Sequence, residues 1–404
     1  MDHDIIIAGG GVAGLTAAVA FGNAGFSVLC VDPAPLVTDR DAEGADLRTT
    51  AFLQPARAFL EAAGLWDRLA PHAMPLETMR IVDAGGAQPK ARLSRDFQSS
   101  DLGDQPFGWN LSNWLLRREI AARIAEMPNV DFVTGASATG AFTRTGEARV
   151  SLSTGEKLRC RLAIAADGRN STLRQGAGID VRTTRFGQKA LAFAVTHPIP
   201  HGNVSTEIHR TGGPFTLVPL PDLEGRPSSA VVWMERGPEA AALYDMDVSD
   251  FEAAMTERSA HLLGPLSLAS RRTIWPIIAQ YATSLSAERL ALVAEAAHVV
   301  PPIGAQGLNM SLTDLLTLLD LAMAAPEDLG SATMLERYHR ARFTDIRTRI
   351  AGITALNRTS MASARPLRDL RAAGISALHG LPPVRRALMQ LGLGANSGST
   401  TASE

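Results

Sequence analysis

The chain has 404 residues, of which 46% are hydrophobic and 20% are charged, and its formal net charge is −2. This length exceeds what one compact core usually holds, so we expect two domains. The small net charge predicts no binding to nucleic acid, which requires a basic surface. Cys30 and Cys160 lack the spacing of metal ligands, so we predict no metal site and two reduced thiols.

The N-terminus carries Asp2 and Asp4 before a short apolar run, without the basic region or the cleavage site of a signal peptide. The apolar stretch over residues 5–31 is long enough to cross a bilayer, but Asn23 and the glycines of a turn interrupt it. We therefore predict a cytoplasmic protein without a membrane-spanning helix.

Residues 4–32 predict a strand, a glycine-rich turn, a helix and a second strand. Gly9, Gly11 and Gly14 have the G-x-G-x-x-G spacing of a dinucleotide-binding unit. Gly9 allows the tight turn, Gly11 leaves room for a pyrophosphate, and Gly14 lets the helix approach the sheet. A glycine-rich turn without a ligand is the alternative.

The helix after these glycines begins near Val12 and Ala13, and its N-terminus offers N–H groups and a partial positive charge to phosphates. Asp32 ends the second strand, 21 residues after Gly11, where a carboxylate can accept both ribose hydroxyls. An acid at this place argues against a 2′-phosphate. The segment therefore predicts binding of NAD or FAD.

Residues 51–70 and 112–127 have the apolar spacing of helices. Residues 78–97 alternate weakly and predict a pair of strands. Residues 130–166 predict short strands, the last of which is apolar.

Residues 186–236 consist of β-rich segments separated by Gly/Pro turns, which predicts an antiparallel sheet. A helix is expected at residues 249–263, a buried strand at 289–296 and a long apolar helix at 310–324. From about residue 333 the pattern is helical and rich in arginine.

Three distant segments favour FAD over NAD, and one of them is Arg48, which follows an acidic loop and could donate to the isoalloxazine ring or the phosphates. In residues 166–171, Asp167 follows an apolar strand, at the sheet edge where α/β proteins bind ligands; a plain turn is the alternative. In residues 290–309, a strand ends near Glu295, and a Pro-Pro loop leads to a helix that opens near Leu308. This carboxylate could bind a ribityl chain, and the helix start could bind the flavin pyrimidine ring. A solvated strand end and a rigid turn are the alternatives.

Together these segments resemble the aromatic-hydroxylase flavoproteins of the p-hydroxybenzoate hydroxylase fold group. Within that group the chain most resembles the ubiquinone-biosynthesis hydroxylases, and the resemblance covers about residues 4–350. The further motifs that carry it are residues 48–52, Asn113 with Leu116, and residues 186–190, 212–221 and 302–309.

Carried over by position, the resemblance implies which residues bind FAD. The glycines would face the pyrophosphate, Asp32 the adenosine ribose and Glu295 the ribityl chain, while Arg48 and Asn113 would lie along the cofactor. The implied set is Gly9, Gly11, Val12, Ala13, Gly14, Asp32, Arg48, Asn113, Asp167, Glu295, Pro302, Gly304, Ala305, Gln306, Gly307, Leu308 and Asn309.

One position departs from the resembled pattern, which usually has Gly-Asp where this chain has Ala294-Glu295. The glutamate keeps the charge but reaches about one methylene further. Ala294 adds a Cβ atom where the backbone normally passes close to the ligand. We expect either a shifted loop or weaker FAD binding.

The predicted fold is α/β, with a Rossmann-type FAD-binding domain interleaved with an antiparallel-sheet substrate domain and followed by a C-terminal helical segment. The FAD-binding domain is predicted to comprise residues 1–75, 98–183 and 273–345. The substrate-binding domain is predicted to comprise residues 76–97 and 184–272. A C-terminal helical segment is expected at residues 346–394, and a disordered tail at residues 395–404.

The resemblance implies an FAD-dependent monooxygenase that hydroxylates a phenol-like ring, with a polyprenylated ubiquinone precursor as the expected substrate. NADH or NADPH would bind transiently and reduce FAD, and O2 would form a flavin hydroperoxide that transfers its oxygen. This chemistry requires a dry pocket, for which residues 188–236 are the candidate wall.

Other functions remain open at this stage. The alternatives are a prenyl reductase, a halogenase, or a non-catalytic scaffold of a quinone-biosynthesis assembly. Residues 275–277 do not match the halogenase motif. We assign no catalytic residue, because lone histidines such as His197, His201 and His209 are more often structural. For His298 we expect a structural hydrogen bond.

The C-terminal part interleaves leucines with basic residues, namely Arg365, Arg368, Arg371, Arg385 and Arg386. Such a segment predicts peripheral contact with the inner face of the membrane, or a helical cap packed on the FAD-binding domain. A homo-oligomer and a biosynthetic complex are both open.

Overall fold

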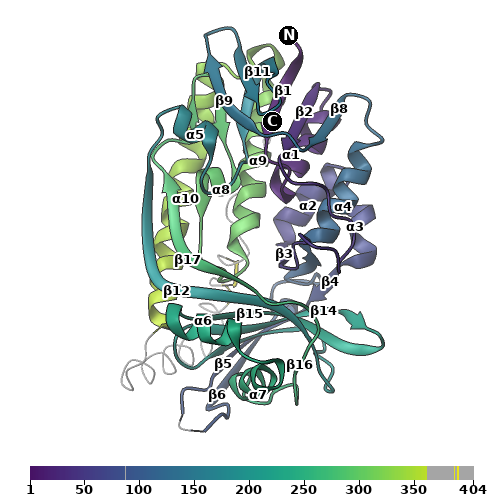
Figure 1. Ribbon diagram of the computed structural model, residues 1–404, viewed down its shortest axis with the longest axis vertical. Helices are drawn as coiled ribbons and strands as arrows, with labels where there is room; N and C mark the ends of the chain where they lie inside the picture. Colours follow the sequence, from purple (N-terminus) through teal and green to yellow (C-terminus); the bar gives the residue numbers. More distant parts are fainter. Residues whose placement is uncertain (87, 362–385, 387–388, 391–404) are drawn as a thin grey trace.

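The computed structural model describes residues 1–86, 88–361, 386 and 389–390 of the chain. Figure 1 shows one large sheet in the upper half, another in the lower half, and a small three-stranded sheet between them. This arrangement of mixed sheets and helices confirms the predicted α/β fold.

The upper sheet has eight strands, and its central part is parallel and built from segments that are far apart in sequence. Its central neighbours are β19 (Leu290–Leu292), β11 (Lys157–Ala165), β1 (His3–Ala8), β2 (Val28–Asp32) and β8 (Val130–Thr134). Antiparallel strands extend it, namely β9 (Ala138–Thr143), β10 (Ala148–Leu152) and β18 (Ser286–Ala287). Because the central strands are parallel, their carboxyl ends meet at one edge, where α/β proteins bind ligands.

Helices from distant parts of the chain pack around this sheet and bury its apolar strands, so that the upper half has one continuous core. They are α1 (Val12–Asn23), α4 (Asn113–Ile124), α5 (Thr172–Gly176), α8 (Ala294–Ala297), α9 (Gln306–Ala324) and α10 (Ala332–Ser360). Three short 3₁₀ turns lie at Ala70–His72, Ser99–Asp101 and Pro326–Asp328.

The lower sheet has nine strands and is mostly antiparallel, as the alternating segments predict. Its main order is β20 (His298–Val299), β17 (Thr273–Ala282), β12 (Val181–Thr196), β15 (Arg226–Arg236), β14 (Pro214–Leu223), β13 (Val204–His209), β5 (Thr78–Asp83) and β6 (Leu93–Gln98). The short β16 (Ser267–Leu268) pairs with β12, and the pair β13–β5 is parallel.

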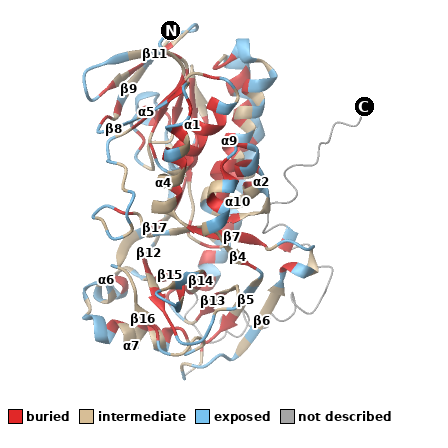
Figure 2. Cartoon of the chain, turned by 90° about the vertical axis from the view of Figure 1, so that its right-hand side faces the viewer, coloured by how far each residue is buried: buried red, intermediate tan, exposed pale blue. Residues whose placement is uncertain are grey.

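The two faces of the lower sheet differ. Below it lie α6 (Gly237–Asp245) and α7 (Val248–Arg258), as Figure 1 shows. The strand residues that pack with Phe251 of α7 are Leu191, Phe193, Val195, Phe215, Leu217, Val231 and Trp233. Because side chains alternate along a strand, the residues next to these in β12 and β15 point to the upper face of the sheet. Two of those residues, Ala190 and Met234, belong to the core of the upper half. Figure 2 shows buried residues along the strands of this sheet and in the elements of the upper half.

The three-stranded sheet joins the two halves. It contains β3 (Thr49–Leu53), β7 (Gly108–Ser112) and β4 (Met74–Leu76). In the sequence, β3 leads directly into α2 (Gln54–Ala62), and α3 (Trp66–Leu69) comes next. The sequence predicts helical structure from residue 51, with Gly64 as a stop, and this prediction is wrong at its start. The first residues pair with β7 instead, and the proline in the first turn of α2 begins the helix only at Gln54.

Two further expectations need correction near the C-terminal part of the upper half. The predicted strand over residues 289–296 ends at Leu292, and Glu295 lies on the short helix α8. The helix expected to open near Leu308 begins at Gln306, after a left-handed residue. Both misplacements arise where residues adopt positive φ values, which apolar spacing does not reveal.

The division into an FAD-binding and a substrate-binding domain stays a prediction, but four of its boundaries cut through elements, namely β4, β6, β12 and α10, and a fifth separates paired strands. The boundary at residue 273 separates β17 from β12, with which it pairs over nearly its whole length. The boundary at residue 345 falls inside α10. Apart from residues 386 and 389–390, the chain after residue 361, including the tail 395–404, lies outside the described residues.

Candidate functional site

The turn between β1 and α1 is shaped by glycines. A Cβ atom on Gly9, which has φ +106°, would lie 2.3 Å from the Ala166 carbonyl oxygen. A Cβ atom on Gly14 would lie 1.9 Å from the Gly9 carbonyl oxygen. By contrast, no atom lies within 4 Å of the place where a Cβ atom of Gly11 would be. Two glycines are thus needed for packing, and the third faces open space that fits a pyrophosphate.

The N-terminus of α1 opens at the same place. Its N-cap residue is Gly11, which makes no side-chain cap, and the first turn contains no acidic residue. The N–H groups near Val12 and Ala13 therefore keep their capacity to bind an anion, and the helix dipole favours one there.

Asp32 lies at the end of β2, beside this turn. Its Oδ2 atom accepts a hydrogen bond from the Gly10 N–H at 2.6 Å, and its Oδ1 atom accepts one from the Ala34 N–H at 2.8 Å. A carboxylate has about four acceptor positions, so two remain for hydroxyl donors such as those of a ribose.

Asp167 follows β11, and the contact between Gly9 and Ala166 brings it to the same edge. Its Oδ2 atom accepts hydrogen bonds from the N–H groups of Thr172 and Leu173, at 2.8 and 3.3 Å. Its Oδ1 atom is buried and has no hydrogen-bond partner among the described residues. The Oδ2 atom of Asp167 therefore caps the N-terminus of α5, and its Oδ1 atom can still accept a hydrogen bond.

Arg117, on α4, lies at the glycine turn and is absent from the predicted set. Its Nε atom donates to the Gly10 carbonyl at 3.0 Å, and its Nη2 atom is buried without a partner among the described residues. It follows Asn113 by four residues, so both lie on one face of the helix. That spacing could have pointed to it from the sequence.

Arg48 and Asn113 both form hydrogen bonds with the Asp46 carboxylate. Arg48 donates to both Asp46 oxygens at 2.8 and 2.7 Å, and Asn113 donates to Asp46 Oδ2 at 3.0 Å. Thr50 donates to the Asn113 oxygen at 2.8 Å. Burial would raise the pKa of Asp46, but its hydrogen bonds and the Arg48 charge lower it overall. The Arg48 guanidinium also lies 5.8 Å from the centre of the Trp275 ring.

Glu295 projects from α8 with 49% of its side chain exposed, and its Oε2 atom lies 3.9 Å from the Arg169 Nε atom. Behind it, the buried Arg174 donates to the carbonyls of Ala296 at 2.9 Å and Arg169 at 3.0 Å. Arg174 therefore ties the segment of Asp167 to the segment of Glu295. Two predicted sites that lie 128 residues apart in the chain are brought to one place.

The alanine that departs from the resembled pattern, Ala294, has φ +54° and is 8% exposed. Ala305, the N-cap residue of α9, has φ +56°. Alanine in this left-handed region is strained by about 1–2 kcal/mol. The loop thus keeps a conformation that favours glycine at both positions.

Five residues of the predicted set lie in or before the first turn of α9, namely Pro302, Gly304, Gln306, Gly307 and Leu308. The last residue of the predicted set has a different environment. The Asn309 side chain accepts a hydrogen bond from the Leu53 N–H at 2.8 Å and donates to the carbonyls of Ala51 and Ala305, at 2.8 and 2.6 Å. This side chain joins α9 to β3, so the groups available to a ligand here are backbone N–H groups.

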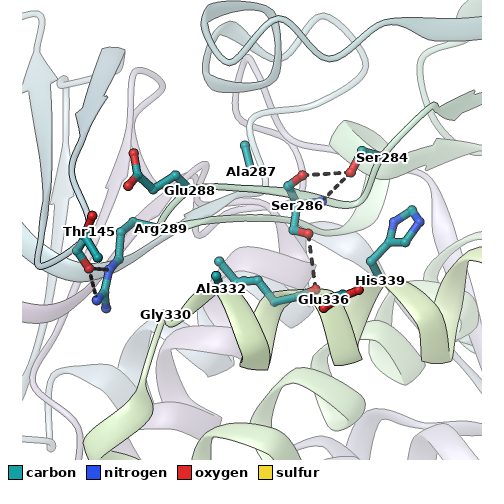
Figure 3. A pocket seen from close by; sticks show the side chains of 11 residues that line it. Thr145, Ser284, Ser286, Ala287, Glu288, Arg289, Gly330, Ala332, Glu336 and His339 are labelled. Atoms are coloured by element: carbon teal, nitrogen blue, oxygen red, sulfur yellow. Dashed lines mark hydrogen bonds between the residues drawn. The ribbon is translucent and has the colours of Figure 1, made fainter.

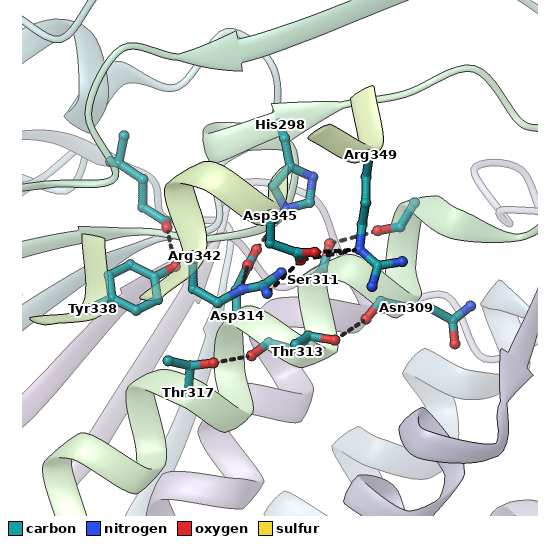
Figure 4. A network of polar contacts seen from close by, with 12 residues as sticks. His298, Asn309, Ser311, Thr313, Asp314, Thr317, Tyr338, Arg342, Asp345 and Arg349 are labelled. Atoms are coloured by element: carbon teal, nitrogen blue, oxygen red, sulfur yellow. Dashed lines mark hydrogen bonds and ion pairs between the residues drawn. The ribbon is translucent and has the colours of Figure 1, made fainter. Parts of the chain in front are cut away.

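A buried polar network lies behind this loop (Figure 4). His298 Nε2 lies 2.6 Å from Asp314 Oδ2, which agrees with the structural hydrogen bond expected for this histidine. Arg342 donates to Asp314 Oδ1 at 2.8 Å. Burial would raise the pKa of Asp314, but the charges and hydrogen bonds of His298 and Arg342 lower it overall.

The upward face of the lower sheet is turned toward the upper half of the molecule, on the side of the lower end of α9 (Figure 1). On β12 and β15, Ala192 faces Val232, and Ala194 faces Ala230, in register. Ala194, Val218 and Val232 are only partly buried, whereas the large side chains of the other face are fully buried. This face is therefore apolar and carries small side chains, a character that suits an apolar ligand.

A pocket of about 460 Å³ lies elsewhere, between the β18 region and α10 (Figure 3). Ser286, Glu288, Glu336 and His339 are among its lining residues, and no residue of the predicted cofactor set lines it. Among the described residues, no helix has both the length and the apolar character needed to cross a bilayer.

Comparison with known proteins agrees with this geometry. Residues 2–350 match the model of the FAD-binding domain family. The chain is 31% identical to ubiquinone hydroxylase UbiL of Rhodospirillum rubrum, over 97% of this chain and 89% of that relative. It is 26% identical to the 3-demethoxyubiquinol 3-hydroxylase of Escherichia coli, over 97% of this chain and 98% of that relative.

Solved structures share the fold. The p-nitrophenol 4-monooxygenase PnpA of Pseudomonas putida superimposes with a TM-score of 0.78 at 19% identity, covering 96% of this chain and 98% of that one. PqsL of Pseudomonas aeruginosa in complex with 2-aminobenzoylacetate gives a TM-score of 0.76 at 21% identity, covering 89% and 97%. The chain belongs to the FAD-binding domain family and, within it, to the FAD-dependent monooxygenases that include the ubiquinone hydroxylases.

Proposed function

We propose that this protein hydroxylates the aromatic ring of a polyprenylated ubiquinone precursor. The observation that carries the proposal is the partly buried face of small apolar side chains, with Ala194 and Val232, that is turned toward the upper half of the molecule. Such a face accepts a flat ring and an alkyl chain better than a charged metabolite. The similarity to a ubiquinone hydroxylase and to a 3-demethoxyubiquinol 3-hydroxylase supports the same substrate class.

We assign FAD to the predicted set, with Arg117 added. The open space at Gly11 and the uncapped N-terminus of α1 fit the diphosphate, and Arg117, whose Nη2 atom is buried without a partner among the described residues, supplies positive charge there. Asp32 accepts hydroxyls of the adenosine ribose, and Glu295 those of the ribityl chain. The backbone N–H groups at the start of α9 bind the pyrimidine ring.

When bound, the flavin is reduced by NADH or NADPH and, with O2, supplies the oxygen atom for the ring. The protein supplies positioning and a dry site. The alanines of β12 and the valines of β14 and β15 exclude water from the ring-facing space. The dipole and the N–H groups at the start of α9 would favour negative charge on the pyrimidine ring. Asn309 keeps this helix start against β3.

The test is oxidation of NADH or NADPH by the FAD-loaded protein in the presence of a prenylated phenol and ¹⁸O2. We expect a hydroxylated ring that carries one labelled oxygen. A saturated prenyl chain would instead indicate a reductase, and a halogenated ring formed with added halide would indicate a halogenase. Hydrogen peroxide alone, with every prenylated phenol tested, would contradict the proposal.

A deletion strain identifies the ring position. Its lipid-quinone profile should accumulate the precursor that lacks one hydroxyl, and expression of the wild-type chain should restore the normal quinone. Restoration by a variant that does not bind FAD would favour the scaffold of an assembly, and would contradict hydroxylation by this chain.

We also propose a cytoplasmic location with peripheral contact to the inner face of the membrane. The basic, leucine-rich segment that contains Arg365, Arg368 and Arg371 supports it, because such segments bind anionic lipid surfaces. These residues lie outside the described part of the chain. Flotation with anionic vesicles tests the proposal, and neutral vesicles are the control; equal flotation, or none with either, would contradict it.

A further inference from the structure

A chain of ion pairs leads from the buried core of the upper half to the loop before α9 (Figure 4). It begins at Asp314, which is 0% exposed and pairs with Arg342 at 2.8 Å. Arg342 Nη1 lies 2.8 Å from Asp345 Oδ2, and Arg349 Nε lies 2.9 Å from Asp345 Oδ1. Arg342, Asp345 and Arg349 all come from α10, spaced by three and four residues, so they lie on one face of that helix.

The outer end of this chain reaches the loop. Arg349 Nη1 lies 3.3 Å from the Gln306 Oε1 atom, and Gln306 Nε2 donates to the Gly304 carbonyl at 2.9 Å. The inner end reaches the same loop on its other side, because Asp314 also binds His298. The segment from residue 298 to residue 306 is therefore held at both ends by one continuous set of ion pairs and hydrogen bonds.

The backbone at this place requires such support. Ala305, directly before Gln306, has φ +56°, a conformation that costs an alanine free energy relative to the usual regions. Residues in sparsely populated conformations persist only where their surroundings over-determine them. The N-cap residue of α9 makes no side-chain hydrogen bond. Asn309 donates to the Ala305 carbonyl from within the first turn, and the contact of Gln306 with Arg349 attaches the same turn to α10.

We propose that Arg349 is a positioning residue for the flavin: held by Asp345, it fixes Gln306 and with it the loop that binds the pyrimidine ring. The inference rests on the proposed assignment of residues 302–309 to the flavin. In the protein without FAD, Arg349 then keeps the first turn of α9 ordered. When FAD is bound, its affinity and midpoint potential depend on where the backbone N–H groups at the start of α9 are placed.

The experiment compares Arg349→Gln, Arg349→Lys and Arg347→Gln. Arg347 lies on the same helix, but its guanidinium lies over Phe343 and Tyr281, at 5.5 and 5.9 Å from the ring centres, and not on the chain of ion pairs. Arg347→Gln therefore removes the same charge without touching the loop. Arg349→Lys keeps the charge but loses the planar group that contacts Asp345 and Gln306 together.

Three readouts separate the possible roles. In the protein without FAD, both Arg349 variants should increase amide hydrogen exchange over residues 303–309 at least tenfold, whereas Arg347→Gln should not. In the FAD-loaded protein, both Arg349 variants should weaken FAD binding about three- to tenfold and shift the midpoint potential in the same direction. Thermal unfolding should show that all three variants fold.

The inference would be overturned if Arg349→Gln and Arg347→Gln changed hydrogen exchange and FAD binding equally, or if Arg349→Lys behaved like the wild type. In either case, the loss of a positive charge alone would explain the data. Faster exchange with unchanged FAD affinity and potential would overturn the assignment of this loop to the flavin, while its attachment to α10 would stand. Failure to hydroxylate a prenylated phenol would concern the substrate only, since none of these readouts uses it.

Discussion

The turn of residues 9–14 and the loop of residues 294–305 both contribute to the proposed FAD site, but they are built differently. In the turn, Gly9 and Gly14 have no side chains because backbone atoms occupy the space where these would be. In the loop, Ala294 and Ala305 keep side chains at positive φ, and residues far away in the sequence contact the neighbouring Ala296 and Gln306. The first region depends on its own sequence and the second on contacts from α10 and β3.

This difference predicts where mutations act. A change within the turn should affect folding or binding directly, according to the space at that one position. A change far from the loop in sequence should affect the loop as strongly as a change within it. Four substitutions test the contrast, beginning with the one for which we expect the largest effect.

Replacing Asp314 with alanine should lower the free energy of unfolding by about 3–5 kcal/mol, because Arg342 and His298 would lose their buried partner. Urea unfolding at pH 7 measures this loss. Asp320→Ala on the same helix, an exposed position without an ion pair among the described residues, is the control and should change stability by less than about 0.5 kcal/mol. Similar losses in both variants would refute the importance of this network.

The same aspartate gives a pH dependence. Its folded-state pKa is lowered from the ordinary value of 3.8, so it stabilises the protein above that value and loses this contribution as the pH falls further. The difference in stability between the wild type and Asp314→Ala should therefore shrink below about pH 4. A difference that stays constant to pH 2 would contradict this explanation.

Replacing Gly14 with alanine should lower the free energy of unfolding by about 1–3 kcal/mol, because its Cβ atom would lie 1.9 Å from the Gly9 carbonyl oxygen. Gly11→Ala is the matched change. Gly11 has φ −67° and open space around it, so this variant should keep its stability without FAD and lose affinity for FAD. Calorimetry of the FAD-free protein and titration with FAD separate the two; loss of stability in both would show that Gly11 serves packing.

Replacing Arg117 with glutamine should weaken FAD binding about tenfold, the effect expected when a charged hydrogen-bond donor is lost. Fluorescence titration with FAD measures this change. Arg118→Gln is the control, because Arg118 pairs with Glu119 at 2.7 Å and lies over Trp114, away from the glycine turn. If both variants bind FAD equally well, Arg117 only supports the Gly10 carbonyl.

Replacing Ala305 with glycine should raise the free energy of unfolding by about 1 kcal/mol, because glycine adopts positive φ without strain. Ala351→Gly, at an exposed position inside α10, should lower it by about 1 kcal/mol, since glycine there only adds flexibility. Opposite signs in thermal unfolding would confirm the strain at Ala305. A loss in both variants would show that the loop conformation carries no strain.

The sequence alone was enough to predict the first βαβ unit, because each of its parts has a local physical signature. The apolar strands, the spacing of Gly9, Gly11 and Gly14, and the acid at Asp32 can be read within one short segment. The antiparallel sheet could likewise be predicted from alternation and turns. By contrast, the contacts of Asn309 could not, since its partners Leu53 and Ala51 lie on another element, β3.

By itself, then, the sequence determined the α/β class, the glycine turn and the flavoprotein family, since each depends on residues whose spacing along the chain carries the information. Only the tertiary structure decided how the loop around Ala294 and Ala305 is held. There the backbone conformation opposes the local preference of alanine, and the contacts of Asn309 and Gln306 with β3 and α10 stabilise it.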